Sequence, residues 1–113
     1  MNRAKSPVIV TDEVRDVIDE GGSVVIECLS SVTKKGTSTV GEWSFEIVSK
    51  DRKTRQPLVF KLTRQTEIVR SAVGVIAKLI SWGLPTIAFP SEKGLIIEIY
   101  SDGRCMPVGG ADT

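Results

Sequence analysis

The feature that most constrains the fold is a long apolar segment, residues 66–82, whose polar residues recur at helical spacing. With about 100° between successive residues of a helix, its polar residues share one stripe roughly 100° wide: Glu67, Arg70, Ser71, Gly74, Lys78 and Ser81. The other sides of this predicted helix are apolar. Gly83 and Pro85, which come just after it, are of the residue types that end helices. A helix with so wide an apolar face has to be covered by a sheet and by a second helix or a second subunit.

The remaining sequence predicts one shorter helix and a series of strands. Thr11 is expected to cap a helix over residues 12–20, and Gly21 and Gly22 to end it. Alternating apolar residues predict strands, and polar residues between them predict a turn at 34–36 and a hairpin loop at 50–56. Gly41 would permit a bulge. The predicted strands are residues 23–33, 37–49, 58–63, 86–89, 95–100 and, after an Asp102-Gly103 turn, 104–108.

These elements predict one α+β domain over residues 1–113. We expect an antiparallel sheet of five to six strands in the order α-β-β-β-α-β-β, with or without a last β, and one long apolar helix packed on it. The ordered core is expected over about residues 8–108, with flexible tails at 1–7 and 109–113. The order of elements is similar to that of the small dimeric type III secretion chaperones, which implies a sheet or helix surface that binds a polypeptide.

The chain has no histidine and only two cysteines, Cys28 and Cys105. This composition excludes histidine-based catalysis, histidine-ligated zinc and a four-thiolate metal site within one chain. Cys28 alternates with Val24 and Ile26, which predicts a core residue. No glycine-rich loop opens a helix as a phosphate loop would. We therefore expect no enzyme, catalytic residue, metal or cofactor; a small carboxylate-dependent enzyme is the remote alternative.

The sequence also predicts a cytoplasmic protein without a membrane partner. The longest apolar region, residues 68–89, contains Arg70, Lys78 and Pro85 and so does not read as a membrane span. Arg3 and Lys5 interrupt the N-terminus before any apolar run typical of a signal peptide.

A net charge of +1 conceals a basic middle between acidic ends. Residues 34–78 carry ten basic and four acidic side chains, whereas residues 1–33 carry three basic and six acidic ones. The hairpin loop KDRKTR and the strand after it are the densest part of the basic region. A protruding basic hairpin can track phosphates, so we predict a nucleic-acid-binding module that uses Lys50, Arg52, Lys53, Arg55, Lys61 and Arg64.

The competing prediction is a homodimeric protein-binding adaptor or chaperone-like domain. Four residues of the predicted long helix are spaced three, four and three apart, which is the spacing of a helix–helix seam: Ser71, Gly74, Lys78 and Ser81. A glycine inside a helix costs about 1 kcal/mol relative to alanine, which favours a close-packing role for Gly74. A solvated stripe explains the same residues, and a solvated hairpin tip explains the basic loop.

Overall fold

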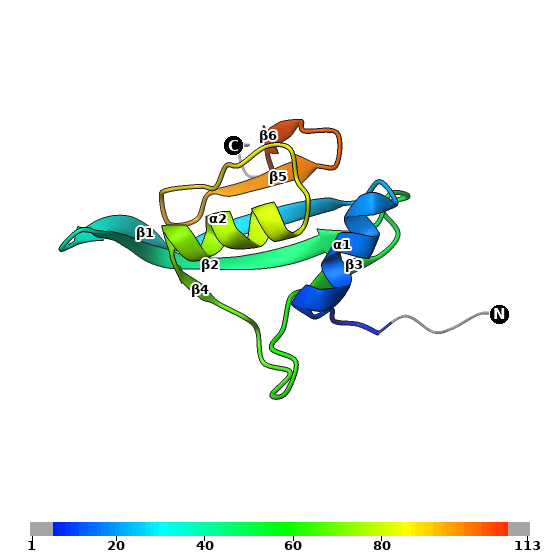
Figure 1. Cartoon of the computed structure of the whole chain (residues 1–113), viewed down its shortest axis with the longest axis horizontal. Helices are drawn as coiled ribbons and strands as arrows, with labels where there is room; N and C mark the ends of the chain where they lie inside the picture. Colours follow the sequence, from blue (N-terminus) through cyan, green and yellow to red (C-terminus); the bar gives the residue numbers. More distant parts are fainter. Residues whose placement is uncertain (1–5, 109–113) are drawn as a thin grey trace.

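The computed structural model describes residues 6–108, which form two helices and one six-stranded sheet (Figure 1). The α+β class and the antiparallel sheet agree with the prediction. Of the tails predicted at 1–7 and 109–113, residues 1–5 and 109–113 lie outside the described residues. In chain order the elements are α1 (Thr11–Asp19), β1 (Ser23–Lys35), β2 (Ser38–Val48), β3 (Arg55–Pro57), β4 (Val69–Ser71), α2 (Ala72–Ser81), β5 (Ile96–Tyr100) and β6 (Cys105–Pro107).

The sheet is built around the long β1–β2 hairpin, which extends beyond the helices at its tip (Figure 1). Its strand order is β3-β2-β1-β5-β6, with β4 also paired to β2, and the pairings between named strands are antiparallel. Gly36 turns the hairpin with a left-handed backbone (φ 65°) that glycine adopts without steric cost. Within the hairpin the extra residues are in β1, between Cys28 and Thr33. Against β4, the register of β2 shifts between Val40 and Trp43, the stretch that contains Gly41, where the bulge was predicted.

Both helices lie on one face of this sheet and enclose the core with it (Figure 1). Alternate residues of β1 and β2 point into the core, as the sequence pattern predicted. Trp82 at the end of α2 packs edge-on against Phe45, with ring centroids 5.6 Å apart, and Trp43 packs in the same way against Phe89 at 5.3 Å. Cys28 is fully buried in this core, as predicted, and burial raises the pKa of its thiol.

The helix predicted over residues 66–82 is shorter and begins only at Ala72. Residues 69–71 pair with β2 as the short strand β4 instead, with Val69 opposite Trp43. Two structural features explain the boundary. The β-branched Ile68 and Val69 favour an extended backbone, and the Ser71 hydroxyl caps the helix by accepting a hydrogen bond of 3.0 Å from the Gly74 N–H.

Two predicted strands are also wrong. Only Arg55–Pro57 pairs as the strand β3, and residues 60–65 form a turn in place of the second half of the strand predicted at 58–63. Leu58 and Val59 are buried, whereas Phe60 and Leu62 are exposed, so the expected alternation ends after Leu58. Residues 86–89 form no strand, but their segment covers the core through Phe89.

The two helices are tied together at Thr11, which was predicted to cap α1. Thr11 is instead the first helical residue, and the backbone N–H of Val10 is satisfied by the Glu13 carboxylate at 3.2 Å. The Thr11 hydroxyl accepts hydrogen bonds from Trp82 Nε1 at 3.2 Å and from Lys78 Nζ at 3.4 Å. This contact places the start of α1 beside the C-terminal end of α2.

Candidate functional site

The predicted basic loop is a compact turn held by its own hydrogen bonds. The Ser49 hydroxyl donates to Asp51 Oδ1 at 2.7 Å and accepts from the Thr54 N–H at 3.1 Å, while the Lys53 N–H donates to Asp51 at 3.0 Å. The Arg52 N–H donates to the Ser49 carbonyl at 2.9 Å. The loop therefore has a defined shape, and its side chains are presented from fixed positions.

Arg52 is the residue that connects this loop to the sheet. Its guanidinium donates two hydrogen bonds to the Glu98 carboxylate of β5, at 2.9 and 3.1 Å. Glu98 is only 3% exposed and also accepts hydrogen bonds from the hydroxyls of Ser23 and Tyr100. A buried carboxylate needs such partners, because losing its hydration costs several kcal/mol. The four side chains form one cluster, which we call the Glu98 cluster.

The protonation of Glu98 is set by two opposing effects. Burial by itself would raise the pKa of the Glu98 carboxyl, but hydrogen bonds from Arg52 and Ser23 and the charge of Arg52 outweigh it, so the pKa lies below its ordinary value. Hydrogen bonds to Glu98 in turn raise the pKa of the Arg52 guanidinium. Both groups are therefore charged at neutral pH.

Of the six cations predicted to bind nucleic acid, three lie beside a carboxylate of another element and three are exposed without such a neighbour among residues 6–108. Arg52 pairs with Glu98, Arg55 pairs with Glu46 of β2 at 2.8 Å, and Lys61 lies 3.6 Å from Asp12 of α1. The other three, which are exposed, are Lys50, Lys53 and Arg64. Three of the six thus have a carboxylate neighbour, which lowers the positive charge that this region offers to phosphates.

Lys50 and Arg52 line a pocket of about 460 Å³ between the loop at 49–54 and the turn that connects β5 to β6. Its other lining side chains include Tyr100 and Arg104 as well as three serine hydroxyls, Ser23, Ser49 and Ser101. The Arg104 guanidinium lies over the Tyr100 ring at 4.4 Å from the centroid, and the Arg52 guanidinium lies 5.9 Å from it. Sequence reasoning missed Glu98, Tyr100 and Arg104; a single charged residue within the apolar run of β5 was the available signal.

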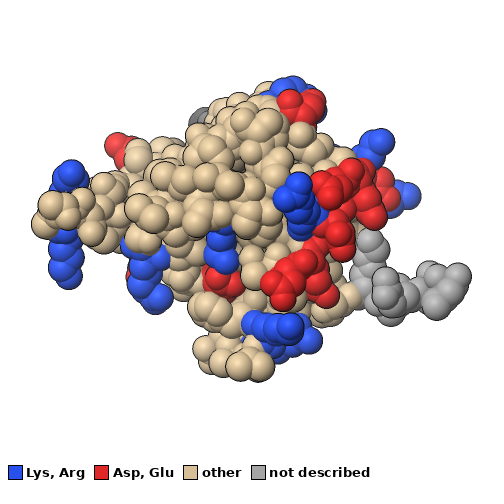
Figure 2. Space-filling model, in the orientation of Figure 1, with Lys and Arg blue, Asp and Glu red and all other residues tan. Residues whose placement is uncertain are grey.

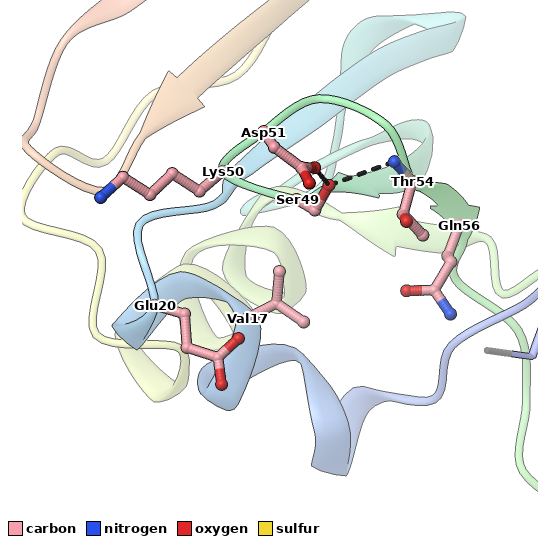
Figure 3. A pocket seen from close by; sticks show the side chains of 7 residues that line it. All are labelled: Val17, Glu20, Ser49, Lys50, Asp51, Thr54 and Gln56. Carbon is pink, nitrogen blue, oxygen red and sulfur yellow. Dashed lines mark hydrogen bonds between the residues drawn. The ribbon is translucent and has the colours of Figure 1, made fainter. Parts of the chain in front are cut away.

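A second pocket, of about 530 Å³, lies between the end of α1 and the same loop (Figure 3). Val17 and Glu20 line it from the side of α1, and the loop and β3 supply Ser49, Lys50, Asp51, Thr54 and Gln56. The basic loop therefore adjoins the acidic helix rather than projecting from it. Two carboxylates, Glu20 and Asp51, and one lysine line this pocket, so it offers phosphates no net positive charge.

Three of the four predicted seam residues, Ser71, Gly74 and Lys78, are partly buried against the same chain, while Ser81 at the end of α2 is exposed. Ser71 caps the helix, Gly74 lies against Val69, and the Ser81 hydroxyl donates to the Lys78 carbonyl. Lys78 forms a 2.6 Å ion pair with Glu67 in which both side chains are mostly buried. The structure thus brings these residues into contacts with α1 and with the segment before α2.

A different side of α2 is exposed and apolar. Val73, Ala77 and Ile80 recur at i, i+4 and i+7, and Val73 and Ile80 are 76% and 61% exposed. Ile87, on the segment that follows, is 41% exposed. We call Val73, Ala77 and Ile80 the outer α2 face. Sequence reasoning had marked the whole wide apolar side of this helix as one requiring cover, and could not tell which part the sheet would leave open.

The surface around the outer α2 face is divided by charge. Figure 2 shows an uncharged surface over most of α2, with acidic side chains gathered over α1 at one end and basic side chains toward the tip of the β1–β2 hairpin. The exposed acidic residues at the first end are Asp12, Glu13, Asp16, Asp19 and Glu20, with one exposed cation, Arg15, among them. Lys34 and Lys35 lie at the hairpin tip.

Within residues 6–108, no three carboxylate or thiol side chains come together as potential metal ligands. Neither of the two helices in this part of the chain has the length and apolarity of a membrane span. The sequence matches no protein-family model, and no solved structure is significantly similar to it. The site is therefore interpreted from its own geometry.

Proposed function

We propose that the protein is a non-enzymatic, homodimeric binding domain in which two copies meet through the outer α2 face. The observation that carries this proposal is the exposure of Val73 and Ile80, 76% and 61%, on an uncharged helix surface. Contiguous exposed apolar surface with a polar rim is typical of protein–protein contacts. A partner that covers this face removes two large aliphatic side chains from water. Such burial stabilises the complex by about 25 cal/mol per Å² of apolar surface.

The charges at the two ends of α2 favour a second copy as the partner. Acidic α1 lies at the C-terminal end of the helix, and the hairpin tip with Lys34 and Lys35 lies toward its N-terminal end. If two α2 helices pack antiparallel about a two-fold axis, the acidic α1 of each copy faces the basic hairpin tip of the other. Because a two-fold contact is self-complementary, both charge pairings form together.

The size of α2 indicates a dimer of modest affinity. A helix of ten residues is about 15 Å long, whereas a standard interface buries about 800 Å² on each partner. The outer α2 face alone is too small for that, so the charged surfaces beside it have to contribute. We expect a dissociation constant in the micromolar range, about −8 kcal/mol of binding free energy.

Sedimentation equilibrium of the full chain tests this proposal over concentrations from about 1 μM to about 1 mM. We expect a reversible monomer–dimer equilibrium. A monomer of constant mass over this whole range would overturn the proposal.

Nucleic-acid binding, predicted from the basic loop, is the weaker proposal. Lys53 and Arg64 support it as exposed cations, but Arg52, Arg55 and Lys61 each have a carboxylate neighbour. A salt titration with generic single- and double-stranded nucleic acid distinguishes the two proposals, because phosphate contacts weaken steeply as salt is added.

A further inference from the structure

The pocket beside the Glu98 cluster combines three cations with one aromatic ring. Lys50, Arg52 and Arg104 line it together with Tyr100, and its volume of about 460 Å³ is in the range of small-molecule sites. We propose that this pocket binds a small organic oxyanion, whose phosphate or carboxylate group contacts the cations and whose planar part lies near Tyr100.

Arg52 is held in place for such a role by the residues beneath it. A guanidinium has five N–H donors, and Glu98 uses two of them. The Arg52 side chain is 47% exposed while that of Glu98 is 4% exposed, so about half of the arginine side chain stays accessible above the buried carboxylate. A fixed guanidinium binds a planar or tetrahedral oxyanion with less loss of side-chain entropy than a mobile one.

The backbone of Arg52 is in an uncommon conformation, which it shares with Arg64 outside the pocket. Its φ of 63° is in the left-handed region, where glycine is the least costly residue and a long side chain is uncommon. Strain of this kind is typical of positions where a particular side chain is needed. The Arg52 side chain has one role in the ion pair with Glu98, and we assign it a second role as a ligand-binding group of the pocket.

The remaining cations of the pocket are available to a ligand. Arg104 Nε contacts both carboxylate oxygens of Asp102, at 3.0 and 3.2 Å. Both side chains are about 60% exposed (63% and 59%), and exposed pairs of this kind contribute little to stability. The Lys50 side chain lies across Gly21 and reaches the same pocket. Asp102 is the one carboxylate among the described lining residues, and Glu98 lies beneath Arg52, so three cations face two carboxylates and the site keeps a net positive charge.

The inference is independent of the proposed dimer. Glu98 and Tyr100 alternate with the core residue Ile99 along β5, so their side chains lie on the face of the sheet opposite the helices. A ligand at Tyr100 therefore leaves the outer α2 face free.

Tyr100 is the only tyrosine of the chain, so a fluorine-labelled tyrosine gives one fluorine NMR signal at the site. The probe is phenyl phosphate, titrated at constant ionic strength, with inorganic phosphate and benzoate as parallel titrations. We expect a saturable shift of the signal and tighter binding of phenyl phosphate than of inorganic phosphate. If benzoate binds as tightly as phenyl phosphate, the site accepts carboxylates. If benzoate binds more weakly, the site prefers phosphates.

The matched variants are Lys50→Ala and Arg104→Ala, which remove pocket cations, and Lys53→Ala, which removes an exposed cation of the same loop. Loss of a charge-assisted hydrogen bond predicts about tenfold weaker binding for each of the first two, and a change of less than about twofold for the third. Arg52 is left intact, because its removal would leave the buried carboxylate of Glu98 without its cation and destabilise the fold. The proposal is overturned if the signal does not move up to about 10 mM probe, or if all three variants bind alike.

Discussion

Arg52 and Glu98 join two parts of the chain that are 46 residues apart. The arginine belongs to the loop after β2, and the glutamate lies in β5 on the other side of β1, so the pair spans the central strand of the sheet. Ser23 of β1 contributes its hydroxyl to the same carboxylate. The pair therefore fixes the loop to three strands and shapes the adjoining pocket.

Removal of Arg52 should destabilise the fold more than removal of its neighbour. In Arg52→Ala, Glu98 stays buried without its cation, and because Arg52 is half-exposed we expect a loss of about 2 kcal/mol, below the full cost of breaking a buried pair. Lys53→Ala, an exposed position in the same loop, should change stability by less than about 0.5 kcal/mol. Urea unfolding measures both, and equal effects of the two substitutions would contradict the role assigned to Arg52.

The lowered pKa of Glu98 predicts the direction of a pH effect. Since the folded-state pKa lies below the unfolded one, the carboxylate stabilises the fold above the ordinary range of a glutamate, about pH 4, and this contribution is lost as the pH falls through the folded value. The stability difference between the natural chain and Glu98→Gln should therefore be largest near neutral pH and shrink in acid. Urea unfolding of both at several pH values tests this, and a difference independent of pH would contradict it.

The local sequence pattern correctly predicted the helices and strands whose intrinsic backbone preference is the same as the conformation they have in the fold. The alternation in β1 and β2, the short helix ended by Gly21, and the Asp102-Gly103 turn into β6 all follow from neighbours in sequence. The start of α2 did not, because the apolar spacing of residues 66–71 fits a helix as well, and the pairing of residues 69–71 with β2 and the Ser71 cap set the boundary. In such a segment the tertiary contacts determine whether the backbone is helical or extended.

The candidate sites were less predictable than the fold. Clustering of basic residues in sequence marked Arg52 and Arg55, but their partners Glu98 and Glu46 are distant or on another strand, so the neutralisation was not visible. The outer α2 face was hidden for a similar reason. Periodicity identifies an apolar helix, but which of its sides the sheet covers depends on how the helix is docked.

The basic hairpin tip should contribute to self-association. If α2 packs antiparallel against its copy, Lys34→Glu with Lys35→Glu places like charges opposite α1 and should weaken the dimer about tenfold at low salt. The effect should shrink at high salt, because exposed charges are screened beyond about 10 Å at 0.1 M. Sedimentation at two salt concentrations measures this. An unchanged dissociation constant would rule out the antiparallel arrangement while leaving contact through α2 intact.

Generic nucleic acid should bind weakly if the carboxylate pairs limit the charge of the basic loop. We expect no complex with single- or double-stranded oligonucleotides near physiological salt, and little difference between the natural chain and Lys53→Glu with Arg64→Glu, which reverses two exposed cations and leaves the Arg52–Glu98 pair intact. Fluorescence anisotropy over a salt series is the measurement. Tight binding that weakens steeply with salt and is lost in this variant would favour the nucleic-acid proposal instead.

Sedimentation equilibrium of a matched pair of variants tests the central claim most directly. Val73→Ser with Ile80→Ser removes the outer α2 face, and Leu62→Ser removes an apolar side chain that is 94% exposed elsewhere on the surface. Both changes are at exposed positions, so circular dichroism should show an unchanged fold in each. We expect a dimer for the natural chain and for Leu62→Ser, and a monomer for the α2 variant. An α2 variant that dimerises as well as the natural chain would contradict it.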